Sequence, residues 1–373
     1  MKVLITGAHF TPAQAVIEEL KEYKDTEIVY VGRKYTQEGD KTLSVESQVL
    51  PKLGVKFISI TTGRLRRILE FRSFISFLKI PVGFFQAFYF LMKEQPKVVL
   101  SFGGYVAVPV VISAWLLNIP VIIHEQTLVS GLANKVTSFF ATKIAITFEK
   151  NYGFNKKKVV LTGNPIRKEL LEDSKKLSTY ALQIIKLKNK DKLPLIYITG
   201  GNQGSLVINK AVFKILDYLT GKAIIVHQTG DSKYHEFDKQ IELKNSLKNK
   251  ERYLVQKWFD AKDVAAIFRK ADLVISRAGA NTLLELAYFG IPTIVIPLPY
   301  LYKDEQNVNA KFFEEKGLVQ ILPQAHLNEQ TLMNKINFML KDLEEFKEDA
   351  SHAKEVVVLN AAEKLTQEVL KYS

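Results

Sequence analysis

Ile275-Ser-Arg-Ala-Gly-Ala-Asn-Thr-Leu-Leu-Glu-Leu-Ala-Tyr-Phe-Gly-Ile-Pro-Thr-Ile-Val-Ile-Pro297 is the stretch that decides the fold. It predicts a strand end, a tight turn of small residues, an amphipathic helix and a second apolar strand. Ala278, Gly279 and Ala280 keep the turn free of bulk, so backbone N–H groups at the helix start can face a phosphate. Glu285 follows about a turn and a half into the helix, where a carboxylate can accept hydrogen bonds from both ribose hydroxyls. The stretch predicts a nucleotide site, although an αβ unit without a ligand fits the motif alone equally well.

Units of the same kind repeat along the chain. Short β-branched runs alternate with helical patterns in two series, at 2–6, 27–31, 97–101, 121–124 and 143–147, and then at 195–199, 223–227, 273–276 and 293–296. This alternation is typical of parallel sheets. Because 373 residues exceed what one core usually holds, we predict an α/β protein of two Rossmann-like domains with parallel sheets.

Turn residues and a polar run separate the two series. The turn cluster is Thr162-Gly-Asn-Pro-Ile-Arg167, and the polar run covers 186–192. We expect a first domain at 1–163 and a second at 164–340, which face each other across a ligand cleft at the carboxyl ends of their strands. The remaining segment, 341–373, has a helical pattern rich in Glu and Lys, and we expect it to pack back on the first domain.

The composition excludes several classes of protein. Apolar residues make up 47% of the chain and charged residues 24%, which argues against a disordered or polytopic membrane protein. Cysteine is absent, so disulfides, thiolate metal sites and cysteine nucleophiles are excluded. The chain enters a strand directly after Met1 with no apolar leader, and we therefore expect it to stay in the cytoplasm.

The charge balance favours an anionic partner. The chain carries 52 basic and 39 acidic residues, a formal net charge of +13. From Thr61 to Leu100 there are seven basic, two acidic and eight aromatic residues, and the aromatics mix with Ile, Leu and Val. Such a surface fits an anionic membrane better than nucleic acid. We expect the basic and aromatic region 64–93 to bind the membrane surface.

A membrane-spanning helix over 73–92 is rejected, because Lys79, Pro81, Gly83 and Gln86 interrupt the segment. The segment also lies between αβ units that must share one side of any bilayer. Two buried helices broken at Pro81 are the alternative to a membrane patch.

Candidate site residues follow three strands of the first domain. Thr6-Gly-Ala-His9 precedes a helix that we expect to start near Pro12. The neutral imidazole of His9 suits proton abstraction from a hydroxyl near pH 7, and a histidine that only caps the helix or packs in the loop is the alternative. Phe102-Gly-Gly-Tyr105 and His124-Glu-Gln-Thr127 follow two further strands, where glycines let a substrate approach the backbone and Glu125 offers a carboxylate.

The second domain offers two more polar segments. Gly200-Gly-Asn-Gln-Gly204 opens a helix like an anion-binding loop, but its spacing is not the dinucleotide fingerprint. Lys303-Asp-Glu-Gln-Asn-Val-Asn-Ala310 supplies amides that can bind sugar hydroxyls, although a solvated helix start is the simpler interpretation. No Asp-x-Asp motif occurs in the sequence. We therefore expect helix N-termini and Arg167, rather than a metal, to meet the leaving-group charge.

With these segments together, the chain resembles the MurG family of N-acetylglucosaminyltransferases over nearly its whole length. The matching segments are Thr6-Gly-Ala-His9 with Pro12-Ala13, Phe102-Gly-Gly-Tyr-Val106, Ile119-Pro-Val-Ile-Ile-His-Glu-Gln126, Gly163-Asn-Pro-Ile-Arg167, Gly200-Gly-Asn-Gln-Gly204, His227-Gln228, Arg277-Ala-Gly-Ala280 through Glu285, and Asp304-Glu-Gln306 with Asn309-Ala310. The chain departs from the family pattern in its first loop, where Leu4, Ile5 and Ala8 replace glycines, and at Thr127 and Asn202, where the family usually has Asn and Ser.

The resemblance implies a GT-B fold and a set of site residues. In the family, positions that hold the uridine and diphosphate match Arg167, Asn202, Phe259, Ala280, Asn281, Thr282, Leu283, Leu284, Glu285 and Gln306, and the proposed base matches His9. The loops described above add further substrate-binding candidates, which are Thr6, Gly7, Ala8, Tyr105, Thr127, Gln203 and Asn307. Glu125 is expected to orient the acceptor or the base.

The implied activity is inverting transfer of N-acetylglucosamine from UDP-N-acetylglucosamine to the muramoyl 4-hydroxyl of undecaprenyl-diphospho-muramoyl-pentapeptide, a step of peptidoglycan synthesis. We expect no cofactor, no metal and no nucleic-acid partner, and a peripheral location at the cytoplasmic face of the cell membrane. The alternatives are a related glycolipid glycosyltransferase, a UDP-N-acetylglucosamine epimerase, or a nucleotide-sugar-binding scaffold without activity.

Overall fold

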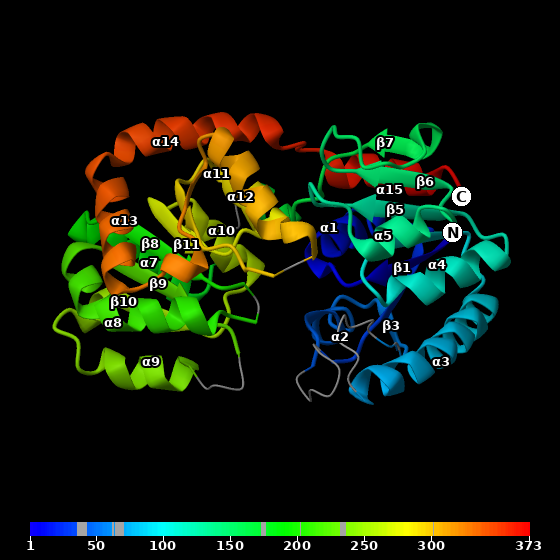
Figure 1. The fold of residues 1–373 in the computed structure, drawn as a ribbon, viewed down its shortest axis with the longest axis horizontal. Helices are drawn as coiled ribbons and strands as arrows, with labels where there is room; N and C mark the ends of the chain where they lie inside the picture. The colour runs from blue at the N-terminus through cyan, green and yellow to red at the C-terminus, as the bar shows by residue number, and fades with distance from the viewer. Residues whose placement is uncertain are drawn as a thin grey trace. The chain divides into compact units, whose positions relative to one another are not determined.

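The computed structural model describes residues 1–35, 43–61, 63, 71–172, 177–201, 203–231, 236–300 and 302–373, apart from the side chains of 71–79. These residues form two compact units (Figure 1). Unit 1 contains Met1–Arg167 and Val358–Ser373, and unit 2 contains Lys168–Val357.

The core of unit 1 is a parallel sheet of seven strands in the order β3-β2-β1-β4-β5-β6-β7. The strands are β1 (Lys2–Gly7), β2 (Glu27–Gly32), β3 (Lys56–Ser59), β4 (Val98–Phe102), β5 (Val121–Glu125), β6 (Lys143–Ile146) and β7 (Val159–Leu161). Val3 and Ile5 of β1 pack on one face and Leu4 on the other, and all three are fully buried. Burial on both faces explains why the central strands consist of continuous apolar runs.

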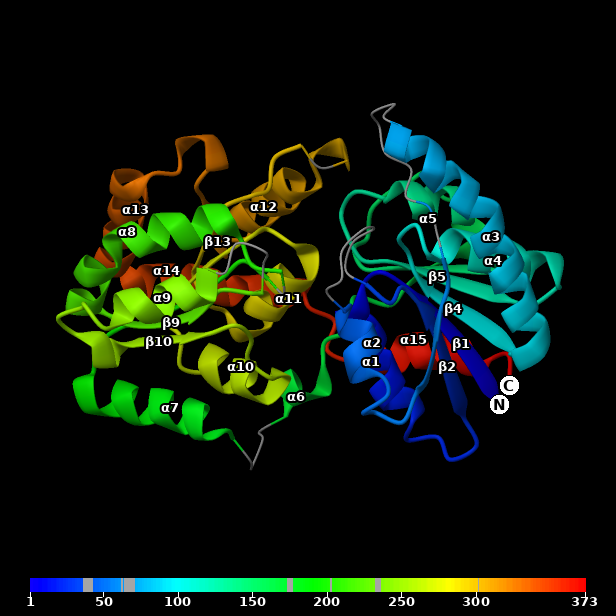
Figure 2. The same ribbon diagram turned by 90° about the horizontal axis from the view of Figure 1, so that it is seen from below.

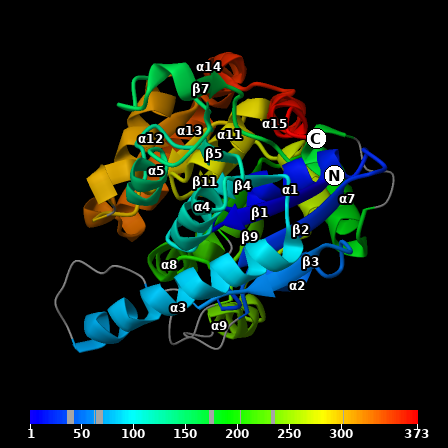
Figure 3. The same ribbon diagram turned by 90° about the vertical axis from the view of Figure 1, so that its right-hand side faces the viewer.

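Helices cover both faces of this sheet. The helices of unit 1 are α1 (Phe10–Leu20), α2 (Val45–Val49), α3 (Phe71–Glu94), α4 (Ala107–Leu116), α5 (Leu132–Thr137) and α15 (Ala361–Leu370). On one face, α1 and α15 lie side by side (Figures 1 and 2) and bury Val16, Leu365 and Val369 in one apolar cluster. On the other face, α3 runs along α4 (Figure 3), and their buried residues include Ala87, Leu91 and Val110.

Helix α3 differs from the alternative of two helices broken at Pro81. Pro81 does not break the segment into two helices, because α3 continues through it as one helix of 24 residues. Proline removes the hydrogen bond that its own N–H would have donated, and its ring crowds the carbonyl four residues earlier, but the many remaining bonds of a long helix can carry it through. In the described part of the chain, no helix combines the length and apolar character needed to cross a bilayer.

Unit 2 contains a parallel sheet of six strands in the order β10-β9-β8-β11-β12-β13. The strands are β8 (Leu195–Thr199), β9 (Ile224–Gln228), β10 (Tyr253–Gln256), β11 (Leu273–Ser276), β12 (Thr293–Val295) and β13 (Val319–Ile321). The helices are α6 (Lys168–Leu171), α7 (Thr179–Asp191), α8 (Leu206–Lys222), α9 (Glu236–Lys244), α10 (Ala261–Phe268), α11 (Ala280–Phe289), α12 (Glu305–Glu315), α13 (Glu329–Lys341) and α14 (Leu343–His352).

Helices α8 and α13 cover one face of this sheet, where Ile196 and Ile198 pack with Leu216 and Ile336. On the other face, Phe268 of α10 meets the ring of Tyr197 edge to face at 5.7 Å. The C-terminal segment is shared between the units. Helix α14 belongs to unit 2, where Lys347 Nζ lies 2.9 Å from Asp272 Oδ1, whereas α15 belongs to unit 1.

The predicted α/β architecture of two Rossmann-like units with parallel sheets is confirmed. The sequence did not reveal β3, β7, β10 and β13, the outermost strands of the two sheets. Every strand pair recorded between neighbouring strands is parallel, so the loops that follow the strands of one sheet emerge at the same edge. This edge is where the candidate site residues of each unit lie.

Candidate functional site

In unit 1, the loops after β1 and β4 pack tightly together. Ala8 N–H donates to Gly103 O at 3.0 Å, and Tyr30 Oη donates to Gly7 O at 3.0 Å. Gly7 has a φ of +140°, and a Cβ there would lie only 2.8 Å from the backbone of Phe102. The glycine therefore lets the two strand ends close on each other. The predicted residues Thr6 and Gly7 are buried, whereas Ala8 and Tyr105 are half-buried.

His9 is the N-cap residue of α1, but its side chain makes no capping hydrogen bond. The side chain therefore does not cap the helix, whereas the other simple interpretation, a histidine that only packs in the loop, stays an alternative. The imidazole is exposed to solvent at the edge of densely packed loops. Although His9 reaches solvent, the protein packed around its ring removes part of the hydration of the charged form and so lowers the pKa of His9 below its usual 6.5, and repulsion by the Arg33 cation lowers it further. A histidine that is neutral at pH 7 and reaches solvent can accept a proton from a hydroxyl.

Glu125 is held by its own loop. Its Oε1 accepts hydrogen bonds from Thr127 N–H at 3.3 Å and Thr127 Oγ1 at 3.2 Å, and its Oε2 accepts from Gly131 N–H and Asn134 Nδ2, each at 3.1 Å. The carboxyl group is buried, and burial raises its pKa despite these bonds. This arrangement fixes the loop after β5, so Glu125 and Thr127 position other groups and are poor candidates for accepting the substrate proton.

In unit 2, the loop after β8 forms a tight turn before α8. Gly201 N–H donates to Thr199 Oγ1 at 3.0 Å, and Gly204 N–H donates to Gly201 O at 3.0 Å. Gly204 has a φ of +71°, and a Cβ there would lie 1.9 Å from Thr229 O. Only glycine fits this position, so the turn holds the start of α8 close to the end of β9. Gln203 is exposed on this turn, and Asn202 lies outside the described residues.

The stretch 275–297 forms the predicted strand, turn and helix. Gly279 precedes α11, and Leu283 N–H donates to Gly279 O at 3.0 Å. The N–H groups of Ala280 and Thr282 lie in the first turn of α11, ahead of Leu283, whose N–H makes this first bond. This end of a helix favours an anion. Glu285 is largely buried on the same helix. The side chains of Leu283 and Leu284 are buried in the protein interior, so at these two positions only backbone atoms are placed to meet a ligand.

Helix α12 is tied to the same edge of the sheet. Gln306 Oε1 accepts from Leu298 N–H at 2.8 Å, and Asn307 Nδ2 donates to Asp304 Oδ1 at 2.7 Å. Asn309 Nδ2 donates to Ala278 O at 3.2 Å and so joins α12 to the turn before α11. Gln306 and Asn307 are half-buried at the start of α12. Their amides therefore lie on a helix that is fixed against the turn before α11.

Two positioning residues escaped the site prediction. Arg277 Nη2 donates to Ser205 Oγ at 2.7 Å and Nη1 to Ile296 O at 2.8 Å, which links the loops after β8, β11 and β12. Gln228 Oε1 accepts from Phe259 N–H at 3.2 Å, and its Nε2 donates to Thr199 Oγ1 at 3.3 Å. Both residues lie in segments that match the MurG family, but the loops that they connect are far apart in sequence. Only the folded sheet brings those loops together.

The remaining predicted residues are placed as follows. Phe259 is half-buried, and its ring lies 5.7 Å from the ring of Tyr180. Arg167 is half-buried and is the last residue of the first segment of unit 1. The proposed roles of all these residues stay predictions.

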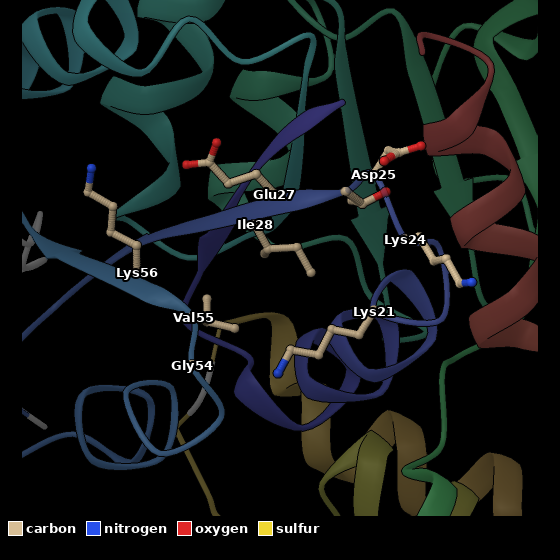
Figure 4. Close-up of a pocket in the computed structure, with 9 residues that line it drawn as sticks. Lys21, Lys24, Asp25, Glu27, Ile28, Gly54, Val55 and Lys56 are labelled. Carbon is tan, nitrogen blue, oxygen red and sulfur yellow. The ribbon is translucent and has the colours of Figure 1, made fainter.

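Two surface hollows lie away from the predicted residues. One, of about 480 Å³, lies at the amino ends of β2 and β3 and is lined by Lys21, Lys24, Glu27 and Lys56 among others (Figure 4). The other, of about 580 Å³, lies beside the amino ends of β11 and β12 and includes Asp272 and Lys347. Neither contains a predicted site residue. Each lies at the edge of its own sheet opposite the loops described above.

The buried histidines His124 and His227 make the fold sensitive to acid. His124 Nε2 donates to Gly163 O at 3.0 Å, and His227 Nε2 donates to Asn209 Oδ1 at 3.0 Å. Burial lowers their pKa values to about 4 and about 3. The folded protein therefore keeps both rings neutral, whereas the unfolded chain takes up a proton on each below pH ~6.5.

The free energy of unfolding is therefore expected to fall as the pH drops below about 6.5. Each of the two buried histidines, one in each unit, is expected to contribute about 2 kcal/mol to the loss at pH 5. Urea unfolding at pH 7.5, 6 and 5 measures this loss. His227→Asn should flatten the pH dependence of the unfolding free energy of unit 2. The control His326→Ala, at an exposed histidine, should leave that dependence unchanged. Equal stability of the parent protein at pH 7.5 and 5 contradicts the prediction.

Comparison with known proteins points to one family. Residues 6–146 match the glycosyltransferase family 28 N-terminal domain, and residues 195–370 match the glycosyltransferase family 28 C-terminal domain. The UDP-N-acetylglucosamine–N-acetylmuramyl-(pentapeptide) pyrophosphoryl-undecaprenol N-acetylglucosamine transferase of Clostridium botulinum (strain Loch Maree / Type A3) is 36% identical, over 100% of this chain and 99% of its own.

Solved structures agree with this relationship. The crystal structure of Acinetobacter baumannii MurG matches with a TM-score of 0.70 at 25% identity, over 99% of each chain. The UDP-GlcNAc 2-epimerase from Neisseria meningitidis, solved bound to UDP-GlcNAc, matches with a TM-score of 0.63 over 100% of each chain. Its identity is only 15%, so this second likeness shows the fold alone.

Proposed function

The chain belongs to the MurG family of glycosyltransferases, and we propose that it transfers N-acetylglucosamine from UDP-N-acetylglucosamine to undecaprenyl-diphospho-muramoyl-pentapeptide. The family match over the full length of the chain is the observation that carries this proposal. The likeness to the epimerase extends to the fold but not to comparable identity, so an epimerase is not favoured.

The donor is assigned to unit 2. The start of α11 presents backbone N–H groups to the diphosphate, the turn before α8 lies at the same edge of the sheet, and Glu285 accepts hydrogen bonds from the ribose hydroxyls. Arg277 supports this assignment because it fixes the two loops to each other through Ser205 Oγ and Ile296 O. Phe259, Gln203, Gln306 and Asn307 complete the donor side, together with Asn202 and Arg167 by resemblance to the family.

The acceptor is assigned to unit 1. His9 takes the proton from the muramoyl 4-hydroxyl, whose oxygen attacks the anomeric carbon and inverts it. The bond from that carbon to the diphosphate oxygen breaks, and UDP leaves with the negative charge. Thr6, Gly7, Ala8 and Tyr105 line the loops beside His9, and Glu125 with Thr127 keeps the neighbouring loop in place. This mechanism assigns no metal and no cofactor to the reaction.

Product analysis tests the proposal. The protein is incubated with radiolabelled UDP-N-acetylglucosamine and separately with muramoyl-pentapeptide and diacylglycerol lipid acceptors. We expect label only in the muramoyl lipid, with the new bond in the β configuration. Label in the diacylglycerol lipid alone, or conversion of the donor to its 2-epimer, contradicts the proposed function.

We also propose that unit 1 binds the anionic membrane surface at the cytoplasmic side. Val82, Phe85, Tyr89 and Met92 are exposed on one face of α3, at the spacing of an amphipathic helix, and the side chain of Phe85 is 72% exposed. Lys93 and Lys97 are exposed close by. Residues 64–70 of the predicted membrane region lie outside the described residues, so the proposal rests on the second half of α3.

Charge placed on this apolar face is expected to weaken membrane binding. Phe85→Glu combined with Tyr89→Glu should lower the affinity for anionic vesicles at least ~10-fold, because each aromatic side chain contributes about 1.5 to 3 kcal/mol when buried. Co-sedimentation measures the change. Phe338→Glu, on exposed Phe338 of α13 in unit 2, serves as the matched control. If the double variant and the parent bind vesicles equally, α3 is not the membrane contact.

A further inference from the structure

Arg33 lies beside the loop of the proposed base. It directly follows β2, whose residue Val31 pairs with Thr6 of β1. That pair is the last one recorded between the two strands, so Arg33 and His9 follow neighbouring parallel strands at the same edge of the sheet. Loss of hydration is the main cause of the lowered pKa of His9, and the positive charge of Arg33 lowers it further. The field of the guanidinium group therefore reaches the loop after β1.

The backbone at Arg33 is fixed. Ser44 Oγ donates to Arg33 O at 2.7 Å, and Ser44 N–H donates to Lys34 O at 2.9 Å. Ser44 also caps α2 by accepting a hydrogen bond from Ser47 N–H. The start of the guanidinium side chain is therefore held in place by a capped helix, which lowers the entropy lost on binding a ligand.

The guanidinium group has unused donors. Its Nε lies 3.4 Å from Glu46 Oε1, a long and weak contact, and the Arg33 side chain is 24% exposed. Nη1 and Nη2 have no hydrogen-bond or ion-pair partner within the ranges that the structure describes. Two nitrogens of a fixed cation therefore remain available to an anion.

The backbone beside Arg33 offers few other hydrogen-bond donors to a phosphate group. The N–H of Ala8 is used by Gly103 O, and the side chains of Leu4 and Ile5 are buried in the core. The methyl group of Ala8 occupies the space beside Gly104, where an added Cβ would lie only 2.5 Å from it. At Ala8, therefore, the backbone N–H is already bonded and the methyl group leaves little room for a phosphate group.

We propose that Arg33 binds a phosphate oxygen of the acceptor's diphosphate through Nη1 and Nη2. The inference rests on the proposed function, because the acceptor of that reaction carries a diphosphate. A guanidinium group suits this ligand, since its planar pair of N–H donors matches two phosphate oxygens. The Arg33 side chain supplies donors in place of the N–H of Ala8, which is already bonded to Gly103 O.

Steady-state kinetics of Arg33→Gln test the role of this side chain. With a short-chain, water-soluble form of the muramoyl lipid, the KM for the acceptor should rise about 10- to 100-fold, as expected for a lost charge-assisted contact. The KM for UDP-N-acetylglucosamine should stay within about twofold. Arg33→Lys should recover part of the loss, because it keeps the charge but not the paired donors. Lys34→Gln, at the exposed neighbouring cation, is the matched control and should behave like the parent.

Direct binding separates failure of this inference from failure of the proposed function. The parent protein should bind farnesyl diphosphate more tightly than farnesol in calorimetry, and Arg33→Gln should lose that difference even if no transfer is observed. Absence of transfer by the parent contradicts the proposed function alone. An unchanged acceptor KM and unchanged farnesyl diphosphate affinity in Arg33→Gln overturn the role of Arg33, as does an equal rise in both KM values together with a lower melting temperature.

Discussion

Replacing His9 with alanine is expected to lower kcat by about 10²- to 10⁴-fold, the contribution of a positioned general base. The loss should fall on kcat, with little change in the KM for UDP-N-acetylglucosamine, because the donor is assigned to unit 2. The lowered pKa of His9 keeps its imidazole neutral at pH 7, so the base form is already populated in the parent protein. Transfer assays at saturating donor and acceptor measure the effect.

Two controls bear on the His9 prediction. His352→Ala removes an exposed histidine of α14 and should leave kcat unchanged. Asn134→Ala removes one of the hydrogen bonds to Glu125 Oε2 and tests the positioning role of that carboxylate. We expect it to reduce kcat by less than His9→Ala, since the other three bonds to Glu125 remain. Unchanged turnover in His9→Ala contradicts the role of His9 as the base.

Replacing Glu285 with alanine is expected to raise the KM for UDP-N-acetylglucosamine about 10²- to 10⁴-fold. A carboxylate that accepts hydrogen bonds from two ribose hydroxyls contributes roughly 1.5 to 3 kcal/mol for each bond. Glu285 is largely buried on α11, so water cannot easily replace it as the hydrogen-bond acceptor. The KM for the acceptor should change little. Initial-rate measurements with each substrate varied in turn separate the two constants.

The Glu285 prediction also has a graded test. Glu285→Gln keeps one oxygen acceptor but loses the charge, and its donor KM should lie between those of the parent and the alanine variant. Glu315→Ala, at an exposed position of α12, is the control for loss of a carboxylate in unit 2. A donor KM that is the same in Glu285→Ala and in Glu315→Ala argues against ribose binding at Glu285.

The sequence predicted the central strands of both sheets because these strands are buried on both faces. Strand β1 and strand β8 consist almost entirely of apolar and β-branched residues, and such runs leave few alternatives. The edge strands were missed because one side of each is open and their apolar runs are short. In β7 the three residues are half-buried or exposed, and β13 includes the polar Gln320.

The candidate site was predictable to the extent that it follows from topology. Parallel strands place their carboxyl ends at one sheet edge, so residues directly after strands, such as His9 and Gln203, were found from sequence position alone. The hydrogen bonds that tie one loop to another were not predictable. Arg277 reaches Ser205 across 72 residues of sequence, whereas the recorded bonds of the Glu125 carboxylate are to residues 127–134, which follow it closely. Such pairings depend on side-chain positions that strand patterns do not specify.

The central claim is that unit 2 holds the uridine diphosphate of the donor through the start of α11 and Glu285. Isothermal titration calorimetry with UDP-N-acetylglucosamine, UDP-glucose and UDP tests it most directly. The account predicts saturable binding of one UDP-N-acetylglucosamine per chain, with a dissociation constant in the range of about 1 μM to 1 mM. It also predicts weaker binding of UDP-glucose and loss of UDP binding in Glu285→Ala. The absence of saturable UDP binding by the parent protein, or equal UDP affinity in the parent and Glu285→Ala, contradicts it.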